Sequence, residues 1–174
     1  ETDKYYSAVT YLGARDIITG ANFEPAKKVT RGEAIVMLMK AFNIQPTENP
    51  KNNFSDAEGE YAGYYAKARE IGMVSGVGNN RLDTDSAITR EALYTMMYNL
   101  KNYLGELPDK KVKEYRGFED SNNTSSWSVE AIKKLVEAGL MNDGSYRQLK
   151  PKAACSKEDF ANILYSFLTK NSIN

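Results

Sequence analysis

A threefold internal repeat constrains the fold of this 174-residue chain more than any other feature of its sequence. Each copy contains a short turn, then an apolar residue, a Thr or Ser, and a basic residue in that order. The basic residues of the three copies are Arg31, Arg90 and Lys157. Because repeats of this size bury their apolar faces only by packing on their neighbours, we expect one folded unit with a shared core.

Each copy opens with a segment in which the spacing of apolar residues predicts an amphipathic helix. Gly72 and Gly139 directly follow two of these segments, where a residue in the left-handed conformation commonly ends a helix. Asp16 takes the same place in the first copy. The predicted helices cover about residues 5–15, 61–71 and 127–138.

A second amphipathic helix closes each copy. Thr30, Thr89 and Ser156 are its expected N-caps, because a hydroxyl oxygen accepts a hydrogen bond from the first turn. Glu33 and Asp159 follow two of these caps at the spacing of a capping box. The expected fold class is therefore all-α, mainly helical with short loops. The apolar residues that recur every three or four positions are Ile35, Leu38, Met39, Phe42, Leu93, Met96, Met97, Leu100, Phe160, Ile163, Leu164 and Phe167.

The sequence divides into three repeats separated by two polar segments. We call residues 1–43 repeat 1, residues 54–104 repeat 2 and residues 118–170 repeat 3. Residues 44–53 and 105–117 are rich in polar residues and contain proline, which is typical of surface linkers. We expect the three second helices to form a central bundle, with the first helices outside it.

The composition excludes several classes of function. The 23 Lys and Arg residues balance the 23 Asp and Glu residues, so no overall charge favours nucleic acid or an anionic membrane. The chain has no histidine, which removes the commonest general base and metal ligand. No apolar run approaches the ~20 residues of a membrane span. Cys155, the single cysteine, occupies an apolar position and is expected in the core. We expect no catalysis, metal or cofactor.

The three basic residues stand at the first helical position, directly after the caps. A cation there opposes the helix dipole, so Arg31, Arg90 and Lys157 need another explanation. One is that each holds an anion together with the free N–H groups of the helix start. The other is a salt bridge to a carboxylate of a neighbouring repeat. The residues alone leave both open.

Other candidate residues have a structural and a functional interpretation. Gly20 and Gly76 could let a ligand approach the backbone, although a turn with positive φ is the preferred explanation. Trp127 could stack on a sugar ring, but a lone tryptophan at a helix start is more often part of the core. The carboxylates of Asp83 and Asp85 are interpreted as turn chemistry, since the glycine and distal glutamate of a calcium loop are missing.

Taken together, the motifs resemble the S-layer homology family. Its repeat has a Phe-x-Asp element, a Gly-Ile-Ile-x-Gly turn, a Phe-x-Pro step and an Ile-Thr-Arg-Ala-Glu motif. The matching stretches are Ile17-Ile18-Thr19-Gly20, Phe23-Glu24-Pro25 and Val29-Thr30-Arg31-Gly32-Glu33 in repeat 1, Phe54-Ser55-Asp56, Gly72-Met73-Val74-Ser75-Gly76 and Ile88-Thr89-Arg90-Glu91 in repeat 2, and Phe118-Glu119-Asp120, Gly139-Leu140-Met141 and Ser156-Lys157 in repeat 3.

The resemblance implies a pseudo-threefold arrangement of three repeats around a central three-helix bundle. It also implies non-covalent anchoring of a larger exported protein to the bacterial cell wall. The ligand would be an anionic, often pyruvylated, secondary cell-wall polysaccharide held in grooves between repeats. The implied ligand-binding residues are Arg31, Arg90 and Lys157, with Gly20, Gly76 and Trp127 as further candidates. No nucleic acid, membrane insertion or cofactor is implied.

The chain departs from the family pattern at several places. Repeat 1 lacks the Phe-x-Asp element, so the sequence is expected to begin inside the repeat, and Ala92 replaces a glutamate in repeat 2. Repeat 3 has Lys157 for arginine, Cys155 for a branched apolar residue and Asp143 for the second turn glycine, so its basic residue is expected to be the weakest contact. Two alternatives remain: a module for protein–protein interaction or S-layer self-assembly, and an enzyme built on carboxylates alone.

Overall fold

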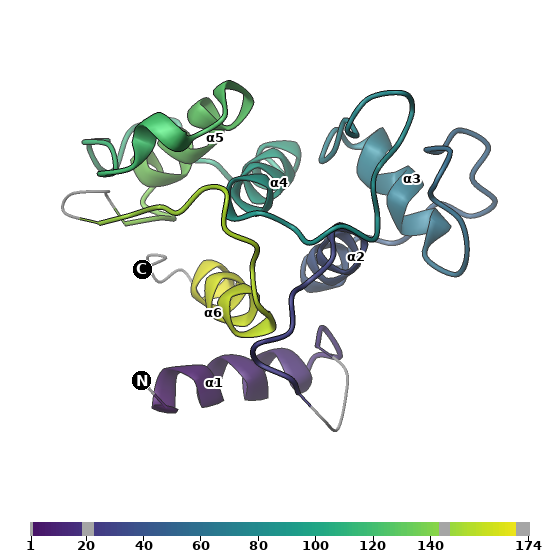
Figure 1. Ribbon diagram of the computed structural model, residues 1–174, viewed down its shortest axis with the longest axis horizontal. Helices are drawn as coiled ribbons and strands as arrows, with labels where there is room; N and C mark the ends of the chain where they lie inside the picture. Colours follow the sequence, from purple (N-terminus) through teal and green to yellow (C-terminus); the bar gives the residue numbers. More distant parts are fainter. Residues whose placement is uncertain (1, 19–22, 143–146, 170–174) are drawn as a thin grey trace.

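The structure is a computed structural model that describes residues 2–18, 23–142 and 147–169. These ranges contain six α-helices and one 3-10 turn, η1, and no strand beyond isolated bridges, so the all-α prediction is confirmed (Figure 1). Within the same ranges, no helix is long and apolar enough to cross a membrane. The elements are α1 (Thr2–Gly13), α2 (Arg31–Ala41), α3 (Ala62–Glu70), α4 (Arg90–Tyr103), η1 (Ser121–Asn123), α5 (Ser126–Glu137) and α6 (Lys157–Leu168).

The predicted N-caps of α2, α4 and α6 are confirmed. The side-chain oxygens of Thr30, Thr89 and Ser156 each accept a hydrogen bond from the backbone N–H three residues later. Glu33 and Asp159 complete capping boxes, because their carboxylates accept from the backbone N–H of the capping residue. Each of these helices therefore begins where local sequence chemistry places it.

The turns that follow three helices contain residues in the left-handed conformation. Gly72 and Gly139 each have a φ of 71°, and Asp16 has a φ of 53° at the corresponding place. The change of direction sends the next residues inward, so that Ile17 and Met73 are buried. The predicted helix ends are thus confirmed, and they lead the chain back into the core.

Outer and inner helices pair across repeat boundaries. In Figure 1, α2, α4 and α6 lie in the middle of the molecule and α1, α3 and α5 lie outside them. The most extensive helix pairs are α4 with α5, α1 with α6, and α2 with α3. Each outer helix therefore packs mainly on the inner helix of another repeat. We call α2, α4 and α6 the inner helices and α1, α3 and α5 the outer helices.

One hydrophobic cluster runs through all six helices. It includes Leu12 of α1, Ile35 of α2 and Leu93 of α4, each at most 1% exposed. Residues from α3, α5 and α6 belong to the same cluster. Because every repeat contributes to a common core, the repeats stabilise one another by apolar burial.

The segments that precede the inner helices are joined by a closed set of backbone hydrogen bonds. The N–H of Val29 donates to the carbonyl of Cys155 (3.0 Å), that of Cys155 to Ile88 (2.9 Å), and that of Ile88 to Val29 (2.9 Å). All three residues are buried. We call these bonds the Val29–Ile88–Cys155 ring; it fixes the starts of the inner helices relative to one another.

Candidate ligand-binding grooves

The first two backbone N–H groups of each inner helix are occupied by carbonyl oxygens of another repeat. Arg31 donates to Ser86 and Gly32 donates to Thr84, each at 2.9 Å. The free N–H groups expected beside the basic residues are therefore absent at these positions, because a neighbouring turn takes the place proposed for the anion. The corresponding bonds run from Arg90 and Glu91 to Ala153 and Pro151, and from Lys157 and Glu158 to Lys27 and Pro25.

The side chain of Arg31 is fixed by the turn of repeat 2. Its Nε donates to the carbonyl of Leu82 at 3.1 Å. The turn is held in place by Asp56, whose carboxylate oxygens accept from the N–H groups of Leu82 (2.7 Å) and Asp83 (2.8 Å). Burial tends to raise the pKa of Asp56, but these hydrogen bonds and the charge of Arg81 leave that pKa lowered. The Phe-x-Asp aspartate thus acts indirectly on the arginine.

Repeat 3 uses the same arrangement for Arg90. The Nε of Arg90 donates to the carbonyl of Leu149 at 2.8 Å. Asp120, from the second Phe-x-Asp element, accepts from the N–H groups of Leu149 (2.7 Å) and Lys150 (2.8 Å). The start of α6 contacts the turn of repeat 1, which lacks this element, and the lysine side chain of Lys157 has no Nε–H to make the equivalent bond.

The outer nitrogens distinguish the two arginines. In Arg90, Nη1 lies 3.7 Å from a carboxylate oxygen of Asp159, and Nη2 donates to the hydroxyl of Tyr94 at 2.9 Å. The salt-bridge interpretation therefore holds for Arg90. For Arg31, the described part of the chain places no carboxylate within 4.0 Å and no hydrogen-bond partner at the outer nitrogens. Arg31 thus keeps one edge of its guanidinium available to a ligand.

Partial burial affects the charge of Arg31. Removal from water lowers its pKa, while the nearby carboxylates of Asp83 and Asp56 act in the opposite direction. An arginine remains protonated under ordinary conditions, so the site carries a half-buried positive charge. Such a charge is screened less by salt than one at the surface.

A cavity of about 710 Å³ brings Arg31, Gly76 and Trp127 together. We call it the Arg31 groove. Its walls come from the start of α2, the turn at residues 73–77, and the sides of α4 and α5. Thr95 and Asn99 of α4 add a hydroxyl and an amide to its lining. Three of the candidates chosen from sequence therefore meet in one place.

Trp127 is an exposed groove residue, so the expectation that it belongs to the core is wrong. Its side chain is 58% exposed. Trp127 lies one helical turn before Ala131, and both residues line the groove from α5. Glu130, also at this wall, is paired with Lys134 at 3.8 Å. The tryptophan ring is available for stacking.

Gly76 is required by its turn. It has a φ of 84°, and a Cβ built on it would lie 2.6 Å from the carbonyl oxygen of Arg81 and 2.7 Å from the ring of Phe54. The preferred structural interpretation of Gly76 is thereby confirmed. Gly20, its counterpart in repeat 1, lies outside the described residues, as does Asp143 in repeat 3.

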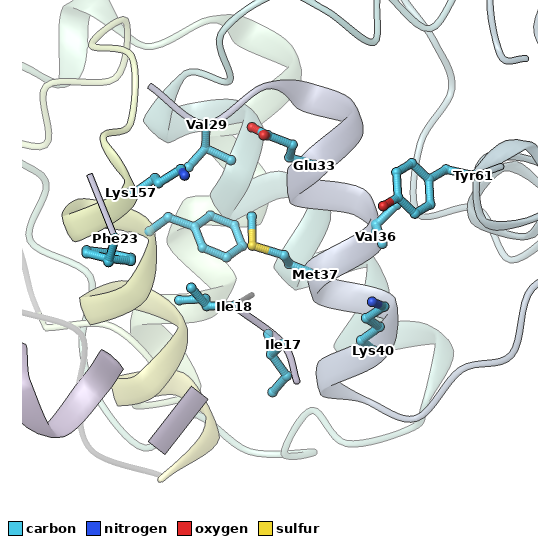
Figure 2. A pocket seen from close by; sticks show the side chains of 11 residues that line it. Ile17, Ile18, Phe23, Val29, Glu33, Val36, Met37, Lys40, Tyr61 and Lys157 are labelled. Atoms are coloured by element: carbon cyan, nitrogen blue, oxygen red, sulfur yellow. The ribbon is translucent and has the colours of Figure 1, made fainter. Parts of the chain in front are cut away.

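A second cavity, of about 210 Å³, contains Lys157 and is called the Lys157 groove. Figure 2 shows Lys157 and Glu33 near Val29, with Lys40 further along α2. Tyr61, next to the start of α3, lines it as Trp127 lines the Arg31 groove from the start of α5. Sequence reasoning did not single out Lys40, whose exposed position on α2 resembles that of any surface lysine.

The carboxylates of the described residues form no group of three or more that could hold a metal ion with His or Cys. Asp83 has a φ of 62°, and its carbonyl accepts from the hydroxyl of Ser86 at 3.1 Å. The geometry of Asp83 is that of a turn residue, as predicted.

Comparison with known proteins supports the resemblance noted in the sequence. The family described as S-layer homology domain matches residues 1–35 and 117–161. The chain is 27% identical over 169 residues to exoglucanase XynX of Acetivibrio thermocellus, covering 94% of this chain and 15% of that protein. It is 26% identical over 164 residues to an S-layer protein of Bacillus thuringiensis subsp. finitimus, covering 90% of this chain and 19% of that protein. The chain thus spans less than a fifth of the length of these curated relatives.

S-layer homology domains typically anchor surface proteins to the cell wall, and proteins that carry them are located at the cell surface. The domain itself is a non-catalytic module, although its carriers include enzymes such as the exoglucanase. The family match covers parts of repeats 1 and 3, and the relatives align with about nine tenths of the chain. The chain is thus similar to the S-layer homology domain family in two regions, and the relatives that align with most of its length include S-layer proteins.

Proposed function

We propose that this chain anchors a larger exported protein to the bacterial cell wall by binding an anionic secondary cell-wall polysaccharide. The observation that carries the proposal is that Arg31 lines the Arg31 groove, while its outer nitrogens have no carboxylate partner among the described residues. An exposed tryptophan, Trp127, lines the same groove. A cation and an aromatic ring together suit a sugar that carries a carboxylate, such as a pyruvylated one.

The groove offers each chemical group that this ligand needs. A guanidinium can grip a carboxylate with two parallel hydrogen bonds, which a lysine cannot do. The Trp127 ring can cover the apolar face of a sugar, and Thr95 and Asn99 can bond its hydroxyl groups. Gly76 has no side chain that could project into the groove from the turn. These residues make the Arg31 groove the primary proposed site.

We infer that the three repeats are arranged around a pseudo-threefold axis and that a central three-helix bundle lies on it. The closed Val29–Ile88–Cys155 ring supports this arrangement, because each N–H donates to the next repeat in turn. The Lys157 groove lies at the equivalent place in this arrangement. Lys157 is proposed as a weaker contact in its groove. Arg90 is proposed as a third contact, restrained by its pairing with Asp159.

Calorimetric titration with a soluble wall-polymer fragment tests the proposal. Arg31→Ala should weaken binding by about 1.5–3 kcal/mol, the value of a hydrogen bond to a charged group. The melting temperature should change little. Arg116→Ala, an exposed arginine between repeats 2 and 3, is the matched control and should bind like the parent. Normal binding by Arg31→Ala would remove the site from the proposal.

The competing function is protein–protein interaction or self-assembly, and S-layer proteins occur among the relatives. Sedimentation with purified cell walls, before and after removal of the polymer, separates the two. Loss of binding with the polymer supports the polysaccharide. Equal binding to stripped walls would favour a protein partner.

A further inference from the structure

Glu91 is a buried carboxylate that the proposed ligand contacts do not use. It lies in the first turn of α4 and is 3% exposed. Its oxygens accept hydrogen bonds from the N–H of Ser125 (2.9 Å), the hydroxyl of Ser125 (2.9 Å) and the hydroxyl of Ser128 (3.2 Å). Lys152 of repeat 3 approaches the same carboxylate at 2.6 Å. Glu91 therefore connects α4 to the start of α5.

This carboxylate lies at the start of a helix that has no side-chain cap of its own. Ser125 is the N-cap residue of α5, yet its side chain makes no capping bond to its own helix. Glu91 places its negative charge at this helix start, where the dipole favours an anion. Lys152 also stabilises the buried carboxylate, because its positive charge neutralises the negative charge of Glu91.

The two serines held by Glu91 lie on either side of Trp127 in the sequence. Ser128 is fully buried, whereas the Trp127 side chain is 58% exposed. So exposed a ring has limited packing of its own to fix its orientation. The position of Trp127 in the Arg31 groove is therefore set largely by the backbone on both sides of it, which Glu91 holds.

The corresponding positions of the other inner helices use different contacts. In α2 the residue is Gly32, and a Cβ built there would lie 2.6 Å from the hydroxyl oxygen of Tyr65. In α6 the residue is Glu158, which is exposed. The buried glutamate thus belongs to the junction of α4 and α5 that bears Trp127, and Glu158 provides a natural control.

We propose that Glu91 is a positioning residue that holds the start of α5 so that Trp127 faces the Arg31 groove. It acts through Ser125 and Ser128 and does not touch the ligand. The effect on binding rests on the proposed function, whereas the effect on Trp127 does not.

Fluorescence tests the proposal without any ligand, because Trp127 is the only tryptophan of the chain. Glu91→Ala should lower the anisotropy of Trp127 and increase its quenching by acrylamide, while circular dichroism remains helical. Glu91→Gln should show a smaller change in the same direction, and Ser128→Ala should reproduce it from the other side of the contact. Glu158→Gln should leave the signal unchanged. Unaltered anisotropy and quenching in both Glu91 variants would overturn the proposal.

Binding to the soluble wall-polymer fragment provides the second measurement. Glu91→Gln should weaken binding roughly two- to tenfold, the range for loss of a well-placed aromatic contact. In the Trp127→Ala background the same change should have little further effect. An equal loss in both backgrounds would show a general structural role and would contradict the proposal. If the parent protein does not bind the fragment, the proposed function fails, and the fluorescence results still decide the role of Glu91.

Discussion

Arg31 and Arg90 occupy the same helical position and donate through Nε to the same kind of turn carbonyl. Two contacts separate them: Tyr94 on the same helix as Arg90, and one residue on the next inner helix along the chain. Asp159 of α6 stands near Arg90, whereas Ala92 of α4 takes the equivalent position near Arg31. Replacement of the motif's glutamate by Ala92 thus leaves the Arg31 groove without that carboxylate. A departure from the family pattern in one repeat bears on the chemistry of a basic residue in another.

Cys155 gives a prediction at the same scale. It is fully buried, and burial raises the pKa of its thiol to about 12, so the reactive thiolate is scarce at neutral pH. Native protein should react slowly with a thiol reagent, and protein unfolded in denaturant should react fast. Cys155→Val should cost less than ~1.5 kcal/mol of unfolding free energy, because Val29 and Ile88 occupy the equivalent positions. Fast labelling of the native protein would contradict this.

The turn held by Asp56 is the element on which Arg31 depends. Asp56→Ala should remove two hydrogen bonds to partly buried N–H groups and lower the free energy of unfolding by about 1–3 kcal/mol. It should also weaken polymer binding, because Leu82 no longer fixes Arg31. Chemical denaturation and titration measure the two effects. Asp109→Ala, an exposed residue of the segment 105–117, is the control.

The pH dependence of this effect has a defined sign. The pKa of Asp56 is lowered in the folded state, so its contribution to stability is present above the ordinary carboxyl pKa and is lost as pH falls through the lowered value. The stability difference between the parent and Asp56→Ala should therefore be largest near neutral pH and shrink in acid. A difference that grows in acid would contradict the assignment.

The helices and their caps could be predicted because their signals are local. Thr30 and Glu33 lie within one turn of each other, and helical periodicity marks the buried side of each helix. The carbonyl groups that accept from the first N–H groups of the inner helices could not be predicted, since Ser86 and Thr84 reach α2 from another repeat. For Trp127, helical periodicity predicts the side of α5 on which the residue lies. It does not predict where along that side the packing against α4 ends and the groove begins.

At the scale of the whole molecule, the interleaved pairing of helices makes the repeats interdependent. Repeat 3 supplies α5, which packs on α4, and α6, which packs on α1. Truncation of residues 118–170 should therefore unfold the remaining two repeats as well, because both would expose apolar surface. Thermal melts followed by circular dichroism should show one cooperative transition for the full chain and none for the fragment. A fragment with a native-like transition would show that the repeats fold independently.

The pairing of α1 with α6 joins the first and last helices of the chain, and an edge-to-face contact of Tyr11 with Tyr165 lies at that junction, with ring centroids 5.2 Å apart. The three outer–inner pairs therefore form a closed circuit, in which the break between the ends of the chain takes the place of a third covalent connection. In such a circuit, the order of the repeats along the sequence can be rotated while the same helices still pack on one another. A circular permutant opened between repeats 1 and 2 keeps every helix pair, so its grooves should be unchanged.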